Sequence, residues 1–282
     1  MIIQQYNQEG NFFFFHHSLS QILPDGLAIG PETHRQYELL YLLRGNLTYS
    51  IEGRSYAVSP GDMILNAPND IHILQIKPGE EYERIVLHFN LELLKEPLRE
   101  LAPGYGDLAW CRSYPVIPGA LCRKYRLSDI LRALVENREP EDCQGLVTLA
   151  KTAELLIGLY KVFSQRGSGL AKPISVDPLI QQAAAFVDAH LSDPISLDHM
   201  AQSLLVSKSS LCHRFRTAMN MTVNRYIAVK KIHLAEELIR RGTGATEAAH
   251  AVGYSNYTTF YYNYKAIIGT APSGKPPEHS QR

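Results

Sequence analysis

The 282-residue chain lacks several features that would place it in a specialised class. Its four cysteines, Cys111, Cys122, Cys143 and Cys212, show no C-x-x-C spacing, which argues against a disulfide scaffold or a zinc cluster and is typical of a reducing cytosol. No apolar run approaches the ~20 residues that span a bilayer, and the N-terminus carries no basic segment followed by an apolar core. We therefore expect a cytoplasmic protein without a membrane partner.

Recognisable catalytic motifs are also missing. The chain contains no G-x-S-x-G, H-E-x-x-H or P-loop pattern, so we predict no catalytic residue, no enzymatic activity and no cofactor. The net charge is zero, but residues 207–282 carry 11 Lys and Arg against 4 Asp and Glu. Such a basic segment is a mild signature of nucleic-acid binding, although a solvated basic face explains the charge equally well.

Residues 1–120 read as β structure. Short runs of Val, Ile, Tyr, Phe and Leu are broken about every ten residues by turn sequences such as Ser59-Pro60-Gly61-Asp62, which is typical of a sandwich or barrel. From Leu121 the apolar period becomes helical, and we expect helices over Tyr125–Asn137 and Cys143–Gln165.

The second of these helices carries a broad apolar stripe. It consists of Leu146, Leu149, Ala153, Leu156, Leu159 and Tyr160. Because the stripe exceeds what a lone connecting helix needs, we expect residues 121–166 to form a dimerisation segment. Gly167-Ser168-Gly169 and Lys172-Pro173 then predict a flexible linker over residues 167–176.

Residues 177–275 are helical and internally duplicated, and residues 276–282 form a tail. The caps and apolar spacing predict helices over Leu197–Leu204, Lys208–Met219, Val223–Arg241, Thr246–Val252 and Asn256–Ile268. The repeat is visible as Leu211 and Phe215 in the first half, and Phe260 and Tyr264 in the second. Each pair is followed by a turn, so the sequence predicts two helix-turn-helix units.

These C-terminal residues resemble the AraC/XylS family of bacterial regulators. The resemblance is carried by Ser207-x-Ser209-x-Leu211-x-x-x-Phe215-Arg216, Lys231-Ile232-x-x-Ala235, Val252-Gly253-Tyr254 and Phe260-x-x-x-Tyr264-Lys265-x-x-x-Gly269-x-x-Pro272. The N-terminal half resembles the cupin-type sensor of the same family through His34, Tyr37-Glu38-Leu39, Gly45, Pro60-Gly61-Asp62 and Pro68 to His72. The resemblance implies a cupin-like all-β barrel with a helical dimerisation segment, followed by an all-α domain.

The DNA contacts follow from the resemblance and from helical spacing. With Leu211, Phe215, Phe260 and Tyr264 facing the core, the outward residues become candidate DNA contacts. They are Ser209, Ser210, Cys212, His213, Arg216, Tyr257, Thr258, Tyr261, Tyr262 and Lys265. Further candidates for phosphate contacts are Arg214, Arg225, Lys230 and Lys231. For each tyrosine, packing against the connecting helix is an open alternative.

The predicted effector pocket contains His34, Gln36, Glu38 and His72, of which the first three share strand parity. Metal-binding cupins gather three histidines and one glutamate, but only His34 and His72 align with such histidines. We therefore expect a hydrogen-bonding pocket for a small polar molecule, a sugar by resemblance, without a metal. His88, within the apolar run Ile85 to Phe89, reads as a core histidine.

The overall prediction is a homodimeric, sequence-specific regulator that binds double-stranded DNA. The resemblance implies activation and RNA polymerase as a further partner. Two alternatives stay open, a cupin-type enzyme and a non-DNA-binding interaction protein with a degenerate helix-turn-helix. The second is kept open by departures from the family pattern at His213, Ala245, Ala248 and Tyr262.

Overall fold

The computed structural model describes residues 2–7, 13–20, 25–91, 94, 100, 108–137, 139–140, 143–164 and 169–272. The chain divides into two compact units, Met1–Val176 and Asp177–Arg282. Among the described residues, the first unit combines β-strands with helices and the second is built of helices, the two classes of structure that the sequence predicts. The predicted tail over 276–282 lies outside the described residues.

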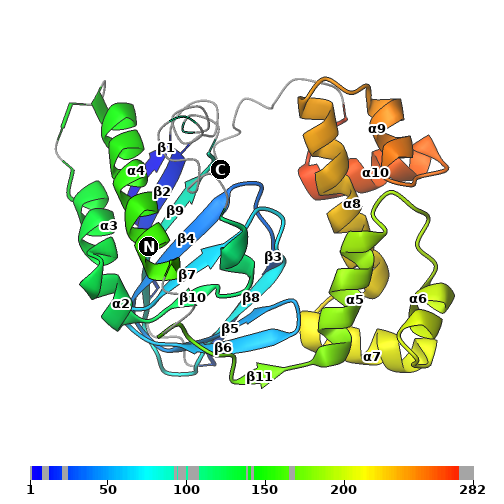
Figure 1. Cartoon of the computed structure of the whole chain (residues 1–282), viewed down its shortest axis with the longest axis horizontal. Coiled ribbons are helices and arrows are strands. Elements are labelled where there is room, and N and C mark those ends of the chain that lie inside the picture. The colour runs from blue at the N-terminus through cyan, green and yellow to red at the C-terminus, as the bar shows by residue number, and fades with distance from the viewer. Residues whose placement is uncertain are drawn as a thin grey trace. The chain divides into compact units, whose positions relative to one another are not determined.

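The N-terminal unit consists of two antiparallel sheets (Figure 1). Its strands are β1 (Ile2–Asn7), β2 (Phe13–Ser20), β3 (Leu27–Glu32), β4 (Tyr37–Arg44), β5 (Leu47–Ile51), β6 (Arg54–Val58), β7 (Met63–Asn66), β8 (His72–Ile76), β9 (Tyr82–Phe89), β10 (Val116–Ile117) and β11 (Ser175–Val176). One sheet has the order β1-β2-β9-β4-β7-β10, and the other has the order β11-β6-β5-β8-β3.

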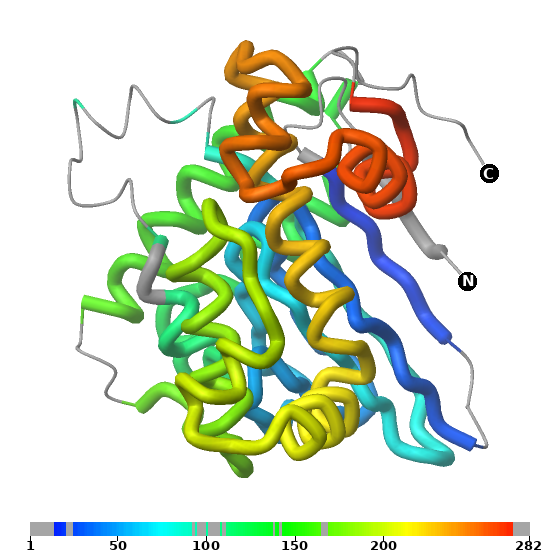
Figure 2. The backbone as a smooth tube through the Cα atoms, turned by 90° about the vertical axis from the view of Figure 1, so that its right-hand side faces the viewer, coloured from blue at the N-terminus to red at the C-terminus, as the bar shows by residue number. Residues whose placement is uncertain are grey.

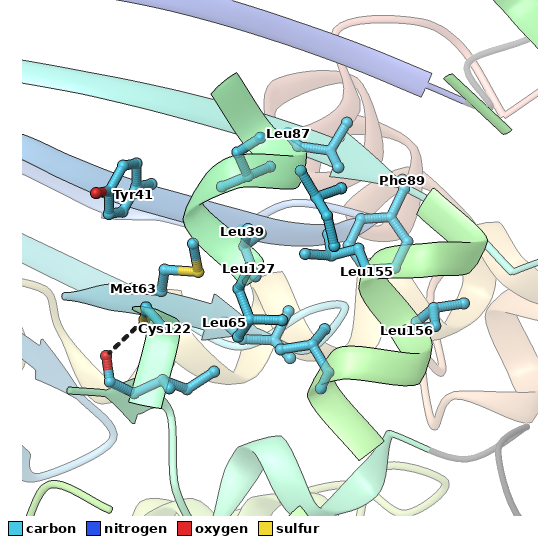
Figure 3. Packing of buried hydrophobic residues seen from close by; sticks show 14 of the residues in the cluster. Leu39, Tyr41, Met63, Leu65, Leu87, Phe89, Cys122, Leu127, Leu155 and Leu156 are labelled. Carbon is cyan, nitrogen blue, oxygen red and sulfur yellow. Dashed lines mark hydrogen bonds between the residues drawn. The ribbon is translucent and has the colours of Figure 1, made fainter. Parts of the chain in front are cut away.

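Strand β4 is buried on both faces, which explains its nearly continuous apolar sequence. Leu40 and Leu42 pack between the two sheets with Tyr49. Leu39 and Tyr41 point the other way and join the core formed with the helices. Figure 3 shows this second core, in which Leu155 lies against residues of the six-stranded sheet.

Three helices cover the outer face of the six-stranded sheet (Figure 1), namely α2 (Gly119–Lys124), α3 (Leu127–Val135) and α4 (Gln144–Phe163). The single helix predicted over Tyr125–Asn137 is wrong at its start. Arg126 has a left-handed backbone with φ of 59°, and this breaks the path between α2 and α3. Among the described helices, α4 included, none is both long and apolar enough to cross a membrane.

The predicted dimerisation stripe on α4 is mostly the inner face of this helix. Leu156 and Leu159 are buried in the unit's own core, and Leu149 and Ala153 pack against that core. Leu146, in contrast, is 70% exposed. The stripe is broad because α4 covers a sheet of its own unit.

The predicted linker is also corrected by the structure. Strand β11 pairs with β6, and the Ile174 amide donates to the Ser55 carbonyl at 2.7 Å. Leu170 is buried in the core between the sheet and the helices. The segment therefore completes the edge of the barrel, and the boundary between the units follows Val176.

The C-terminal unit contains α5 (Pro178–Ala189), α6 (Leu197–Ser203), α7 (Lys208–Met219), α8 (Val223–Arg240), α9 (Ala245–Ala251) and α10 (Tyr257–Ile268). Ser207 caps α7 by accepting from the Ser210 amide at 3.1 Å, and Asn256 caps α10 in the same way. Helix α8 connects the pair α6–α7 to the pair α9–α10 (Figure 2). The helix ends predicted from these caps therefore agree with the observed ends to within one or two residues.

Candidate functional site

The N-terminal unit contains a buried polar cluster centred on Glu38, which is 6% exposed. Glu38 shares the inward face of β4 with Leu40 and Leu42, so its carboxylate lies between the two sheets. His88 stands directly opposite Glu38 on β9, and Asn66 stands opposite it on β7. The sheet register therefore gathers three polar side chains in an otherwise apolar layer.

The contacts of Glu38 are short. Its Oε2 atom lies 3.0 Å from His34 Nε2 and 3.4 Å from His88 Nε2, while its Oε1 atom lies 3.5 Å from His72 Nε2. Asn66 Nδ2 donates to Oε1 at 2.7 Å, and the Tyr49 hydroxyl donates to the Asn66 side-chain oxygen. One carboxylate thus contacts three imidazoles and one amide in a buried site.

Opposing effects set the protonation states of this cluster. Burial would raise the pKa of Glu38, but the hydrogen bond with His34 and the neighbouring histidines hold that pKa well below its ordinary value. Burial alone would lower the pKa of His34, yet its bond to Glu38 raises it. Burial lowers the pKa of His88 to about 4 and also lowers that of His72. Glu38 is therefore the negative centre of a mainly neutral pocket.

Three of the four predicted effector residues, His34, Glu38 and His72, come together in this cluster. The shared strand parity predicted for His34, Gln36 and Glu38 is wrong, because β4 begins at Tyr37. His34 and Gln36 lie in the loop after β3, and from there the His34 side chain contacts Glu38 at the start of β4. Gln36 is partly buried, and its place in the pocket stays a prediction.

His88, predicted as a core histidine, lies inside the unit and adds a contact to Glu38 that its sequence did not predict. Its neighbours Leu87 and Phe89 face the helical core, whereas His88 points to the opposite side of β9. The alternation of side chains along a strand places Tyr82, Val86 and His88 on the same face of β9. Because Tyr82 and Val86 pack between the sheets, this alternation indicates that His88 faces the same layer.

Two overlapping groups in this region have the geometry of a cation site. His34, Glu38 and His88 offer ligand atoms that all lie within 4.8 Å of one another, as do Glu32, His34 and His72. Imidazole nitrogen and carboxylate oxygen are ligands for transition metals such as zinc. The pocket is thus able to receive either hydrogen-bonding groups or a metal ion.

The C-terminal unit presents two helices with polar outer faces. On α7, Leu211 and Phe215 are fully buried. On α10, Phe260 is fully buried and Tyr264 is 4% exposed. The predicted core pairs are confirmed, and each second helix of its pair keeps one side free of the core.

The predicted DNA contacts lie on these free faces. Ser209, Ser210, His213, Arg216, Tyr257, Thr258, Tyr262 and Lys265 are exposed, and Cys212 and Tyr261 are partly buried. Tyr262 stands out because 67% of its surface is accessible.

Two predicted phosphate contacts are wrong, because Lys230 and Lys231 are each 5% exposed. The Lys230 ammonium pairs with Asp188 at 3.0 Å. Lys231 Nζ donates to the carbonyls of Asp193 and Val252, at 2.6 and 2.7 Å. Both charges therefore hold helices together inside the unit and do not face a ligand.

Comparison with known families matches both units separately. Residues 24–144 match the AraC-like ligand binding domain, and residues 200–274 match a helix-turn-helix domain. This chain belongs to the AraC/XylS family of transcription regulators. The ligand-binding match precedes the helix-turn-helix match, so the polar cluster lies in the ligand-binding part of this AraC-family chain.

Several curated proteins resemble this AraC-family chain over most of their length. HTH-type transcriptional regulator YbfI of Bacillus subtilis (strain 168), itself uncharacterised, is 21% identical over 79% of this chain and 78% of its own. The XylDLEGF operon transcriptional activator of Pseudomonas putida is 22% identical over 87% and 76%. HTH-type transcriptional activator RhaR of Escherichia coli O139:H28 is 23% identical over 87% and 84%. These relatives are regulators, which sets the enzyme alternative aside.

Among solved structures, unsaturated fatty acid bound wild-type ToxT from Vibrio cholerae strain SCE256 is similar over 95% of this chain and 96% of its own. Its sequence is 15% identical, and the TM-score is 0.41. At this score the likeness adds nothing to the assignment, which rests on the two family matches.

Proposed function

We propose that this regulator activates transcription at specific DNA sites when a small polar molecule, a sugar or its derivative, binds the sensor pocket of His34, Gln36, Glu38 and His72. The observation that carries the proposal is the buried Glu38 cluster inside the ligand-binding domain. A polyhydroxyl ligand needs convergent donors and acceptors, and this cluster offers both. Activation is supported by the relatives named as activators, and the sugar class rests on the family resemblance alone.

For the DNA contacts, we propose that α7 and α10 enter successive major grooves. Helix α8 has 18 residues, which at ~1.5 Å per residue gives about 27 Å, close to the ~34 Å of one duplex turn. The base-reading residues would be Ser209, Ser210, Cys212, His213, Arg216, Tyr257, Thr258, Tyr261 and Tyr262, with Lys265 on phosphate. The proposed place of action is the cytoplasm, with a homodimer as the active form and RNA polymerase as a partner.

DNA recognition is tested with DNA selected from a random pool by the full-length chain. Footprints are expected to show two protected patches about one helical turn apart for each chain. Tyr262→Ala should weaken binding by ~1–3 kcal/mol if this side chain contacts a base. Tyr114→Ala, which removes a 39% exposed tyrosine of the sensor unit, is the matched control. Protection of a single groove would contradict the proposal that both α7 and α10 contact the DNA.

The effector is tested by screening sugars for thermal stabilisation of the full chain, with and without a chelator. A stabilising sugar should also change the affinity for the selected DNA, because only a ligand that distinguishes two states shifts their balance. Glu38→Ala should abolish both effects, while Glu83→Ala, outside the cluster, should leave them intact. If no sugar stabilises the chain, the sugar class is wrong, and the DNA footprint still decides the regulator role.

A further inference from the structure

Residues 169–176, which we call the connector, lead from the sensor unit to the DNA-binding unit. Leu170 anchors the connector in the sensor core, but Ile174 is 63% exposed and Val176 is 46% exposed. The Ile174 amide donates to the Ser55 carbonyl at 2.7 Å, and β11 pairs with β6. Because these last residues are largely exposed, this end of the connector can open locally at low cost while the sensor stays folded.

The turn over residues 67–70, between β7 and β8, borders the effector pocket. The Asn69 amide donates to the His34 carbonyl at 2.8 Å. The Asp70 carbonyl lies 3.4 Å from His72 Nδ1. Both histidines contact the Glu38 carboxylate, so a ligand that displaces either of them also displaces this turn.

Arg112 joins the turn to the strand on which the connector docks. Its Nη2 atom donates to the Pro68 carbonyl at 3.1 Å and lies 3.5 Å from the carboxylate of Asp70, which is 2% exposed. On the other side, the Arg54 guanidinium of β6 donates to the carbonyls of Arg112 and Ser113. The pocket is thus linked to β6 through contacts at both ends of Arg112.

Asp177 continues this link to the first reader helix. Arg54 stands opposite Val176 in the pairing of β6 with β11, and Asp177 follows Val176 directly. One carboxylate oxygen of Asp177 caps α5, accepting from the Leu179 amide at 3.0 Å. The same oxygen accepts from the Arg214 guanidinium of α7 at 2.6 Å. The residue that follows the connector therefore holds α7.

We propose that the connector has a docked and an opened arrangement, and that Arg112 makes the balance between them depend on the pocket. In the docked arrangement, Arg112 holds the turn while β11 pairs with β6. Opening frees Asp177 from the strand and, with it, the carboxylate that orients Arg214 on α7. An effector shifts this balance if it binds the two arrangements with different affinity. The inference rests on the proposed function and names the regulation of the same pocket.

The first experiment measures hydrogen exchange of the Ile174 amide in the full-length chain, without DNA or sugar. Arg112→Met removes both side-chain contacts to the turn and should speed this exchange at least about fivefold, the lower end of typical couplings between sites. Arg132→Met, the same change at an exposed position of α3, is the matched control. It should keep the wild-type exchange rate.

The second experiment changes the pocket without touching the connector. Glu38→Gln loosens His34 and His72, and it should speed Ile174 exchange at least about fivefold when Arg112 is present. In the Arg112→Met background the same change should add less than about twofold. Such a double-mutant cycle separates a link through Arg112 from two independent losses. If Glu38→Gln does not fold, Arg112→Met alone decides the question.

The third experiment tests the step to α7 by footprinting on the selected DNA. Asp177→Asn keeps a capping side chain but removes the charge that holds Arg214. Protection of the α7 patch should then need at least about fivefold more protein, while the α10 patch stays as in wild type. Asp198→Asn is the control, because Asp198 also pairs with α7, through Lys208 at 3.0 Å, but lies outside the connector. It should leave both patches unchanged.

The inference is overturned if Arg112→Met exchanges at the wild-type rate, or if Glu38→Gln acts equally in both backgrounds. It is also overturned if Asp177→Asn weakens the two patches equally. The exchange measurements contain no DNA, so their failure beside two protected patches leaves the proposed regulator function standing. Conversely, a chain that shows the expected exchange but protects no DNA would contradict the proposed function and leave the link from pocket to connector intact.

Discussion

At the scale of single residues, Leu205 occupies a conformation that its side chain disfavours. It lies in the turn between α6 and α7, with φ of 56°, and is 92% exposed. A left-handed backbone costs a residue other than glycine roughly 1–2 kcal/mol, and no packing compensates here. Leu205→Gly should therefore raise the free energy of unfolding by about 1 kcal/mol, measured by urea denaturation of the full chain.

Leu205→Ala is the control, because alanine removes the exposed side chain but keeps the Cβ atom and its strain. It should leave stability within about 0.5 kcal/mol of wild type. Equal stabilisation by both variants would show that exposure of the leucine, and not the backbone, is the cost.

The same scale shows what could be predicted at the sensor site. His34, Glu38 and His72 follow from the family resemblance, and the structure brings them together. His88 could not be assigned because its role depends on β9 pairing with β4 so that His88 faces Glu38. A shift of one residue in the register of a strand moves every side chain to the opposite face of the sheet. The register of β9 depends on contacts that are distant in the sequence.

At the scale of elements, Lys231 of α8 ties the two helix-turn-helix units together. Its ammonium donates to the carbonyl of Asp193, before α6, and to that of Val252, at the end of α9. A Cβ atom added at Gly253 would lie 2.7 Å from the Asp193 carbonyl, so the two segments are in close contact. Lys231 thus joins segments that are distant in the sequence.

Lys231→Met keeps the length of the side chain but removes the donor to the buried Val252 carbonyl and to the partly buried Asp193 carbonyl. The cost should be ~1–3 kcal/mol of unfolding free energy, and the two footprint patches should no longer be protected together. Arg240→Met, an equal change of charge at an exposed position of α8, is the control. If both variants lose the same stability and DNA protection, the loss of a positive charge is the cause, and the Lys231 hydrogen bonds are not.

Elements with a local signal could be predicted well. The range Lys208–Met219 is correct at both ends, because Ser207 supplies the cap and Asn220 takes the left-handed turn. The break at Arg126 has no glycine or proline to mark it. Strand β11 escaped prediction because its partner β6 lies more than a hundred residues earlier, so composition alone suggested a linker.

At the scale of the whole molecule, the free face of α4 is the proposed homodimer contact. The inner face is occupied, since Leu156 is 2% exposed within the sensor's own core. The outward face carries Leu146, which is 70% exposed, and Ile157, which is 47% exposed. A dimer through this face would place four reader helices on one DNA site, and paired sites raise affinity without new contacts.

The double variant Leu146→Glu/Ile157→Glu should give a folded monomer that protects half of the selected site. Sedimentation velocity at micromolar concentration measures its mass, and circular dichroism measures its helix content. Leu156→Glu is the contrasting variant, because a charge in the core should lower the free energy of unfolding of the sensor unit by several kcal/mol. Wild type that sediments as a monomer would contradict the dimer. A double variant that stays dimeric would move the contact away from α4, since a pair of carboxylates at its centre would not be tolerated by an apolar interface.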